Sequence, residues 1–288
     1  MAASLQELKD IINAKMSTAD FNKISNFIYN ECGIKLPEAK KVMLQSRLQK
    51  RLRELKYTNF SDYCDFVFSK EGQNSNELIH MIDVVSTNKT DFFREPVHFD
   101  YLTNSALPEF YKENRVRRPL KVWSAACSSG EEPYTLAIVF SEFAEKNPGF
   151  DYSIFGTDIS TQILRKAVNA IYKEERIAVI PMNLKKKYFL KSKNTVDKLV
   201  KVDDSLRKKV SYARLNFMDA YYDVKETFDI IFCRNALIYF NRETQESVIN
   251  KLCMKLKPGG YFFLGHSESI IGMNVPLNQI KPTIFKKI

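Results

Sequence analysis

The chain has few of the residues that build disulfides or metal centres. Its only cysteines are Cys32, Cys64, Cys127, Cys233 and Cys253. They are widely separated and form no CxxC pair, which indicates neither a disulfide framework nor a zinc site and fits a reducing cytosol. Its only histidines are His80, His98 and His266. They also lack the spacing of metal ligands, so we expect no bound metal.

Long apolar runs are absent as well. The longest, IIFC at 230–233 and YFFL at 261–264, fall far short of the roughly 20 residues of a membrane-spanning helix. The first residues, MAASLQELKDIINAKM, include acidic side chains and the apolar period of a helix, unlike a secretory signal. We therefore expect a cytoplasmic protein with no direct membrane insertion.

Motifs of several enzyme classes are also missing. The chain has no GxSxG motif of acyl-transfer enzymes and no GxGxxG fingerprint, which disfavours a dinucleotide or P-loop site. Asn235 is not followed by the two prolines expected of a base methyltransferase that acts on exocyclic amines. No proline precedes Cys233 as it would before a cytosine-C5 nucleophile, and we assign this cysteine to the core.

What the chain does contain is an excess of positive charge. It carries 44 Lys and Arg against 34 Asp and Glu, a formal net charge of +10. Such an excess predicts an acidic partner, which could be a nucleic acid, an anionic membrane or an acidic protein surface. With 288 residues, of which 44% are hydrophobic, the chain can build one large domain and a smaller companion.

The amino-terminal part has the periodicity of helices. From residue 4 to about 74, apolar side chains recur at intervals of three and four, which predicts a small helical bundle. Gly33 should end one helix, Pro37 should open the next, and Ser61 should cap a third. We assign residues 1–75 to an all-α domain and 76–288 to a second domain, with a linker at about 76–90.

Beyond Pro119 the pattern changes to short apolar runs that alternate with helical segments. The runs are LKVWSAA, YSIFGTD, FDIIFC and GYFFLG, and helices should begin at about Glu132 and Thr161. This alternation predicts an α/β domain with a parallel, Rossmann-like sheet. The turn 257–260 should precede a strand that begins at Tyr261. The stretch 172–214 breaks the pattern with 13 Lys or Arg against 5 Asp or Glu, and we interpret it as a small inserted subdomain.

The segment VWSAACSSGEEPY combines a strand, a turn of small residues and the start of a helix. In open α/β sheets, crevices at the carboxyl ends of strands hold cofactors, although a tight turn without a ligand is an alternative. Glu132 could meet a positively charged amine there. Asp158 ends the next strand and could accept hydrogen bonds from both hydroxyls of a ribose, or it could cap the following helix. These residues favour a cationic, ribose-bearing cofactor.

Five segments, in this order, carry a resemblance to a known family: TNKTDFFRE (87–95), VWSAACSSGEEPYTLA (122–137), GTDIS (156–160), FDIIFCRNALIYF (228–240) and LKPGGYFFLGHSES (256–269). They resemble the CheR-type methyltransferases of chemoreceptor glutamates. The resemblance implies a class I methyltransferase core with a small all-α amino-terminal domain and an inserted β-subdomain. It also implies S-adenosylmethionine as cofactor, glutamate methyl esters as product, and a chemoreceptor cytoplasmic domain as partner, with no nucleic acid.

The resemblance also implies site residues. The cofactor contacts would be Asn88, Thr90, Arg94, Glu132, Asp158, Asn216, Phe217, Arg234 and Asn235. Glu131 is the alternative to Glu132, because the two are adjacent. Arg94 and Tyr239 would orient the acceptor carboxylate, although Arg94 could instead pair with Glu95 and Tyr239 could be a half-buried aromatic.

Two surfaces could contact the receptor. The basic residues Arg47, Lys50, Arg51 and Arg53 lie opposite a leucine stripe on one helix. We expect this helix to dock on the acidic receptor, with a solvated helix face as the alternative. Some relatives also bind a receptor pentapeptide through a glycine-containing loop in the inserted subdomain. The corresponding stretch, 189–202, has no glycine, so we expect no such tether here, although Asn194 can tolerate the left-handed conformation.

Other functions are also compatible with these residues. The same core could methylate another acidic protein, a small molecule or nucleic acid. The chain could also be a non-catalytic module that binds S-adenosylmethionine and regulates a partner.

Overall fold

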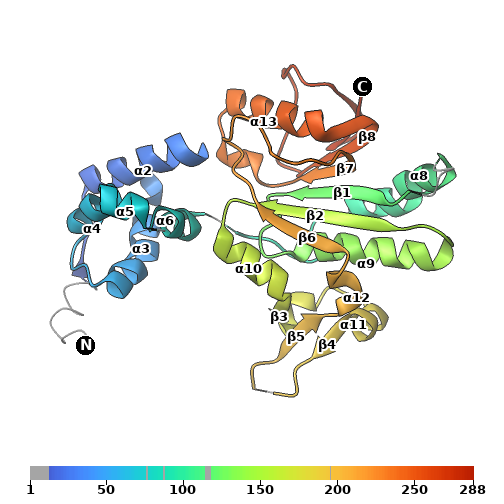
Figure 1. Cartoon of the computed structure of the whole chain (residues 1–288), viewed down its shortest axis with the longest axis horizontal. Coiled ribbons are helices and arrows are strands. Elements are labelled where there is room, and N and C mark those ends of the chain that lie inside the picture. The colour runs from blue at the N-terminus through green and yellow to red at the C-terminus, as the bar shows by residue number, and fades with distance from the viewer. Residues whose placement is uncertain (1–12, 76, 87, 114–117, 195) are drawn as a thin grey trace. The chain divides into compact units, whose positions relative to one another are not determined.

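The computed structural model describes residues 13–75, 77–86, 88–113, 118–194 and 196–288. They form two compact units, of which the first combines the described residues before Asn88 with Tyr239–Asn241, and the second contains the described residues of Asn88–Ile238 and Arg242–Ile288 (Figure 1). Within these ranges, no helix has both the length and the apolar character that a membrane crossing requires.

The first unit is helical. Its described elements are α2 (Thr18–Cys32), the 3-10 turn η1 (Glu38–Lys40), α3 (Lys41–Leu55), α4 (Phe60–Val67), α5 (Lys70–Asn74) and α6 (Glu77–Val85). Gly33 ends α2 with a left-handed φ of 70°, and Pro37 precedes η1, as the sequence predicts. The prediction for Ser61 is wrong. Asn59 caps α4 by accepting a hydrogen bond from the Asp62 N–H, so the helix begins at the buried Phe60.

The second unit is built on a seven-stranded sheet (Figure 1). Its strands are β1 (Leu120–Ala125), β2 (Tyr152–Asp158), β6 (Val210–Arg214), β7 (Phe228–Cys233), β8 (Leu256–Leu264), β9 (Leu277–Lys281) and β10 (Ile284–Lys287). Their order is β6-β2-β1-β7-β8-β10-β9. The first five strands in this order are parallel, and β10 pairs antiparallel with β8 and β9. The chain therefore reverses direction across the sheet at β1, where α/β folds bind their ligands.

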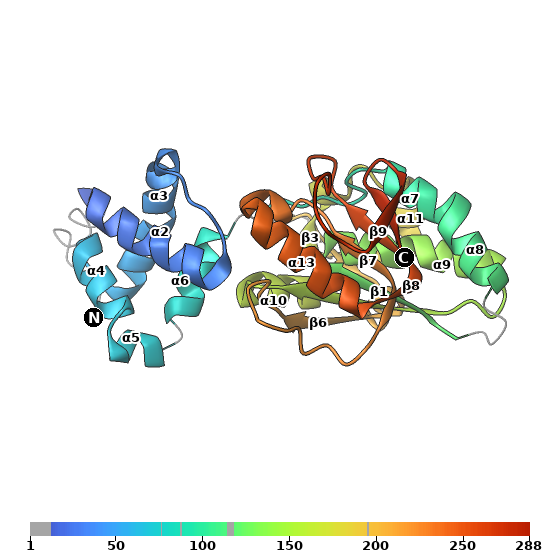
Figure 2. The ribbon, with the colours of Figure 1, turned by 90° about the horizontal axis from the view of Figure 1, so that it is seen from above.

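Helices cover the sheet through apolar side chains. They are α7 (Val97–Tyr101), the π-helix η2 (Leu102–Ala106), α8 (Leu107–Glu113), α9 (Glu131–Lys146), α10 (Thr161–Asn169) and α13 (Arg242–Lys255). Leu107 of α8 and Leu136 of α9 belong to the same buried core cluster as Val122 of β1. Helix α13 contacts β8 (Figure 2). Strands β1 and β7 are buried along most of their length, which explains why apolar residues predominate in their sequences.

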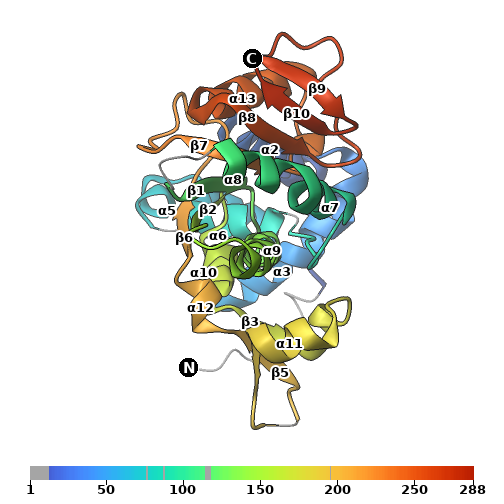
Figure 3. The same cartoon turned by 90° about the vertical axis from the view of Figure 1, so that its right-hand side faces the viewer.

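A smaller antiparallel sheet interrupts the second unit. It has the order β3-β5-β4, with β3 (Ile171–Lys173), β4 (Phe189–Lys191) and β5 (Leu199–Val202). The turn η3 (Glu174–Ile177) and the helices α11 (Met182–Tyr188) and α12 (Asp204–Arg207) accompany it (Figure 3). The range 172–214 assigned to this insertion also contains β6, which pairs with β2 in the large sheet.

Strand β8 begins earlier than the sequence suggests. The expected turn at 257–260 lies within β8, where the register with β7 shifts between Phe228 and Ile230. Gly260 passes so close to β7 that a Cβ atom would lie 2.8 Å from the Asp229 carbonyl oxygen. Glycine therefore lets the strand continue through an irregular pairing with β7. The sequence pattern at the same positions is typical of a turn.

Candidate active site

The turn after β1 has an unusual backbone. Ala126, Ser128 and Gly130 all have positive φ angles, of 59°, 50° and 94°. The first two are residues that rarely adopt this conformation, and such strain clusters at functional sites. A Cβ at Gly130 would lie 3.0 Å from the Ala167 Cβ, so the turn packs tightly against α10. Small residues thus bring the backbone close to the carboxyl edge of the sheet, where a ligand can approach it.

Asp158 joins this turn to the end of β2. Its Oδ2 accepts a hydrogen bond from the Ser128 N–H at 2.9 Å, and its Oδ1 accepts one from the Ser160 N–H at 3.0 Å. Asp158 is not the cap of α10, because the Ser160 hydroxyl accepts from Ile163 N–H in that role. A carboxylate offers about four lone-pair sites, so backbone donors do not prevent it from also accepting ribose hydroxyls.

The adjacent glutamates Glu131 and Glu132 face different parts of the unit. Glu131 is buried and pairs with Arg176 of η3 at 2.7 Å, so it ties α9 to the inserted subdomain. Glu132 accepts a hydrogen bond from the Ser124 hydroxyl of β1 and pairs with Arg234 after β7, both at 2.7 Å. Glu132 therefore lies at the reversal point of the sheet, and its contact with a cofactor amine stays a prediction.

Arg234, a predicted cofactor contact, lies among charged and polar groups of the protein. Its side chain is 2% exposed, and its Nε donates to Glu132. Nη1 lies 3.3 Å from Glu95 Oε2 and 2.8 Å from His98 Nδ1, and Nη2 donates to the Arg94 carbonyl at 2.8 Å. The guanidinium is thus surrounded by protein groups. The guanidinium therefore orients Glu132 and Glu95, and a contact between Arg234 and the cofactor stays a prediction.

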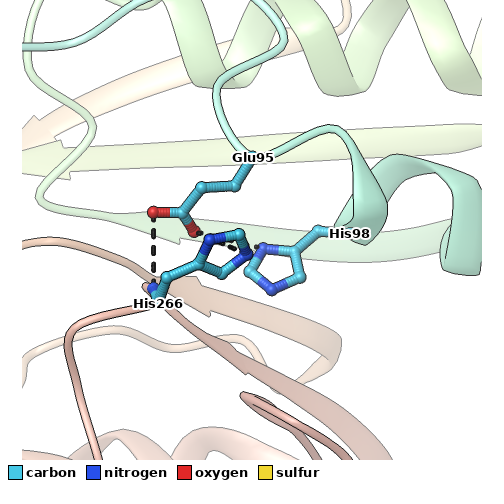
Figure 4. A group of neighbouring side chains, drawn as sticks. All are labelled: Glu95, His98 and His266. Atoms are coloured by element: carbon cyan, nitrogen blue, oxygen red, sulfur yellow. Dashed lines mark hydrogen bonds and ion pairs between the residues drawn. The ribbon is translucent and has the colours of Figure 1, made fainter.

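Three of these neighbours resemble a metal site (Figure 4). The ligand atoms of Glu95, His98 and His266 lie within 4.8 Å of one another, although His266 and Glu95 are 171 positions apart in sequence. The ring nitrogen of His98 that faces Glu95 already contacts Arg234, and its other nitrogen contacts Thr283. Burial, followed by the charge of Arg234, lowers the pKa of His98 to about 4. A cation would have to displace and repel the guanidinium, so we assign these groups to an ion-pair network.

Asn235 follows Arg234 at the end of β7 with a φ of 58°. Its N–H and that of Leu237 donate to the Glu268 carboxylate at 2.9 and 2.7 Å. Its side-chain nitrogen donates to Glu95 Oε1 at 3.1 Å. Sequence reasoning missed Glu95 and Glu268 as site residues. Both residues nevertheless lie in segments that resemble the family. Glu95 is next to Arg94 in the segment 87–95, and Glu268 follows a buried strand in the segment 256–269.

The segment after residue 87 lies against the turn after β1. The Ser128 hydroxyl donates to the Asn88 carbonyl at 3.2 Å. Thr90 is 9% exposed, and Arg176 donates to its carbonyl oxygen. Arg94 donates to the Lys89 carbonyl at 2.9 Å, whereas Glu95 pairs with Arg234. The structure therefore places Asn88 beside the turn that Asp158 holds and Thr90 beside Arg176, and the contacts of both residues with the cofactor stay predictions.

Asn216 and Phe217 follow β6 beside the same edge. The Leu215 N–H donates to the Asp158 carbonyl at 3.0 Å, which fixes the start of this loop. Asn216 Oδ1 accepts from the Met218 N–H at 3.0 Å, and Phe217 is 8% exposed.

Tyr239 belongs to the first unit, where its ring lies 5.6 Å from the Lys40 ammonium. Its role toward the acceptor stays a prediction.

The proposed docking residues of α3 divide into two groups. Arg47 donates to the carbonyls of Val84, Val85 and Ser86 at 3.4, 2.8 and 3.1 Å, so it caps the end of α6.

Arg51 belongs with Arg47, because it forms a bidentate pair with Glu77, which is 3% exposed. These two arginines hold the helical unit together. Lys50 and Arg53 lie on the exposed face of α3 and remain available for docking.

The fold and the site together define a class of enzyme. An open α/β sheet that reverses at β1, with the carboxylates of Asp158 and Glu132 at the edge where its parallel strands end, has the architecture of a Rossmann-like methyltransferase core. The helical unit and the small inserted sheet are additions to that core.

Comparison with known proteins identifies the family. Residues 19–86 match the CheR methyltransferase, all-alpha domain family, and residues 88–285 match the CheR methyltransferase, SAM binding domain family. A chemotaxis protein methyltransferase of Borreliella burgdorferi is 39% identical over 279 residues, which cover 96% of each chain. One of Escherichia coli K12 is 37% identical over 254 residues, covering 88% of this chain and 85% of that one. The chain belongs to the CheR methyltransferase family, and its cofactor is S-adenosylmethionine.

Proposed function

We propose that this methyltransferase esterifies glutamate side chains in the cytoplasmic helical domain of a chemoreceptor. The observation that carries the proposal is the family match over residues 19–86 and 88–285, which includes the helical unit as well as the cofactor-binding unit. A relative that shared only the catalytic core would leave the acceptor open. The similar proteins of Borreliella burgdorferi and Escherichia coli are both named chemotaxis protein methyltransferases.

The chemistry needs little beyond positioning. A glutamate side chain has a pKa of about 4.3, so at neutral pH it is already a carboxylate nucleophile. One carboxylate oxygen attacks the methyl carbon of the sulfonium. The new C–O bond forms as the C–S bond breaks, and the bonding electrons return to sulfur, which becomes a neutral thioether. No proton moves, so the enzyme has to align the two groups and exclude water.

Named residues would divide the remaining work. Asp158 would hold the ribose, and Glu132 would pair with the cofactor amine. Asn88, Thr90, Asn216 and Phe217 would surround the rest of the cofactor from the two neighbouring loops, and Asn235 would contact it from the end of β7. Arg94 and Tyr239 would orient the acceptor carboxylate, one through a charge-assisted and the other through a neutral hydrogen bond.

The cysteines support a place in the cytoplasm. In the described residues all five are free thiols and buried. An oxidising compartment would favour their pairing, whereas a reducing one keeps them as they are. We therefore also propose that the enzyme acts on the cytoplasmic side of the receptor.

The test is methyl transfer to a receptor fragment. The protein would be incubated with methyl-labelled S-adenosylmethionine and the cytoplasmic fragment of a chemoreceptor. We expect base-labile label at specific glutamates, and no label in a control fragment with glutamine at those positions. Failure to label any receptor fragment, by a protein that binds the cofactor, would contradict the proposed acceptor.

A further inference from the structure

Glu268 is a buried carboxylate whose partners are backbone N–H groups. It is 8% exposed and follows β8. Its Oε2 accepts hydrogen bonds from Asn235 N–H at 2.9 Å and from Gly265 N–H at 2.7 Å, and its Oε1 accepts from Leu237 N–H at 2.7 Å. One side chain thus fixes two loops, one after β7 and one after β8.

The loop after β7 needs such a support because its conformation is unfavourable. Asn235 has a left-handed φ of 58° directly after a buried strand. Asparagine tolerates this conformation better than most residues, but the backbone still has to be held in it. Glu268 accepts hydrogen bonds from the N–H groups of Asn235 and of Leu237, two residues further on. It therefore holds the backbone at and after the strained position.

The side chain of Asn235 is held as well. Its nitrogen donates to Glu95 Oε1 at 3.1 Å. Because an ionised carboxylate only accepts hydrogen bonds, it selects the NH₂ end of the amide. The amide oxygen of Asn235 is then the end that can accept a hydrogen bond from a ligand, and an amine is a suitable donor.

Gly265 completes this arrangement. A Cβ atom at position 265 would lie 2.5 Å from the side-chain nitrogen of Asn235 and 2.8 Å from its backbone nitrogen. Any larger residue would push Asn235 out of place. The loop after β8 therefore shapes the end of β7 by contact as well as by hydrogen bonds.

We propose that Glu268 is a positioning residue for cofactor binding: together with Gly265 it fixes Asn235 so that the Asn235 amide oxygen faces the amine of S-adenosylmethionine. The proposal depends on the cofactor contact proposed above for Asn235. Glu268 itself touches neither cofactor nor acceptor and acts through the loop that it holds.

The chemistry of Glu268 supports a positioning role. Burial raises its pKa above the ordinary value, and the backbone donors oppose that effect by favouring the carboxylate. An apolar side chain would avoid the desolvation of a charge but would leave three N–H groups without an acceptor. A carboxylate satisfies all three groups at once.

The principal test is the Glu268→Gln protein. Glutamine keeps the shape but turns an NH₂ group toward one of the backbone donors, so the loop should shift. We expect the affinity for S-adenosylhomocysteine, measured by calorimetry, to fall about 5- to 150-fold, which corresponds to the roughly 1–3 kcal/mol of an unsatisfied buried group.

The matched control is Asp229→Asn. Asp229 is also buried, is also in the second unit, and accepts from the Lys121 N–H as well as from Arg118, but it lies at the opposite end of β7. This substitution should lower the melting temperature and leave the cofactor affinity of the folded protein unchanged. It separates a loss of stability from a loss of positioning.

Two further variants keep the inference falsifiable. Gly265→Ala displaces Asn235 without removing a charge, so it should weaken binding even if Glu268→Gln fails to fold. The Asn235→Ala, Glu268→Gln double variant should bind about as weakly as the weaker single variant, because both act through one contact.

The outcomes are distinguishable. If Asn235→Ala leaves the affinity unchanged, the cofactor contact of Asn235 is wrong and the positioning role falls with it. If Asn235→Ala weakens binding but neither Glu268→Gln nor Gly265→Ala does, only the positioning role is overturned. Additive losses in the double variant would also overturn it.

Discussion

Asp158 links two turns of the site through its two carboxylate oxygens. Replacing it with alanine should weaken binding of S-adenosylmethionine and its demethylated product by roughly 1.5–3 kcal/mol, the usual loss for a charged hydrogen-bonding group. Calorimetry on the folded variant measures the change. Asp151→Ala is the control, because Asp151 precedes the same strand and pairs with Lys209 at 2.5 Å. An unchanged affinity in Asp158→Ala would remove this residue from the cofactor site.

His98 predicts how stability depends on pH. Its pKa is about 4 in the folded protein, against about 6.5 in the unfolded chain, so the unfolded state binds more protons between these values. The stability that neutral His98 supplies is therefore present above pH 6.5 and is lost as the pH falls toward 4. By pH 5 the loss should be about 2 kcal/mol.

The measurement is denaturant unfolding at pH 7.5, 6 and 5. The His98→Gln variant cannot titrate at this position, so its unfolding free energy should fall less steeply over the same range. Parallel curves for the two proteins would show that His98 does not carry the effect. Most carboxyl groups titrate below this window, so they contribute little to the difference.

A variant at Tyr239 tests whether this residue acts in methyl transfer or in cofactor binding. If its hydroxyl orients the acceptor carboxylate, Tyr239→Phe should lower kcat by about two- to tenfold, the equivalent of one neutral hydrogen bond. The affinity for S-adenosylhomocysteine should not change. Turnover at the parental level would leave Tyr239 with no catalytic role, and an equal loss of cofactor affinity would place it in the cofactor site instead.

At the scale of single elements, α3 carries the docking hypothesis. Arg47 and Arg51 bind opposite ends of α6, Arg47 at the Val85 carbonyl and Arg51 at the Glu77 carboxylate. Reversing their charge would therefore destabilise the helical unit itself. Lys50→Glu with Arg53→Glu is the appropriate test, because both side chains are exposed. We expect a higher KM for the receptor fragment and a weaker dependence of KM on salt, because fewer charges attract the acidic substrate.

The control for α3 is a charge reversal elsewhere on the same unit. Lys15 and Lys70 are exposed and lie outside α3, so Lys15→Glu with Lys70→Glu makes the same change in net charge. If both double variants raise KM equally, general attraction rather than docking explains the effect. If neither does, the receptor binds to another surface.

The loop between β4 and β5 carries the hypothesis about the receptor tail. It closes with a hydrogen bond from Ser192 N–H to the Leu199 carbonyl at 2.9 Å. In the described part of this loop the left-handed conformation falls on Lys198, with a φ of 45°, rather than on Asn194; residue 195 lies outside the described residues. Side chains throughout the loop should crowd an incoming peptide backbone.

We therefore expect pentapeptides from receptor tails not to bind. A fluorescence titration at modest ionic strength measures this, with a scrambled peptide of the same charge as control. Saturable micromolar binding of the tail peptide alone would contradict the expectation. Weak binding of both peptides alike would reflect the positive charge of the insertion rather than a specific site.

At the scale of the whole molecule, the sequence predicts the features that depend on local patterns. The buried strands β1, β2 and β7 are visible as apolar runs, and Gly33 and Thr161 mark helix ends that the structure confirms. The placement of Asp158 follows from the rule that parallel strands present their carboxyl ends at one edge. Local patterns fail where a glycine allows a strand to continue, as at Gly260 in β8.

The features that the sequence does not predict depend on distant partners. Glu95 meets Arg234 at a separation of 139 residues, and nothing near either residue announces the other. The basic face of α3 poses a similar problem, because charge alone does not distinguish Lys50 from Arg47, which caps another helix. Long-range pairing decides these roles, and only three-dimensional coordinates reveal it.

The position of β1 inside the large sheet, between β2 and β7, affects how the chain folds during synthesis. Lys121 of β1 meets Asp229 of β7, which lies 108 residues further along the chain. At a synthesis rate of about 5–20 residues per second, one edge of β1 stays without its partner for roughly 5 to 20 seconds after β1 emerges. An apolar strand with an open edge can pair with other nascent chains. The helical unit completes its short-range contacts well before then. The risk of aggregation is therefore greatest in the interval when β1 has been synthesised and β7 has not.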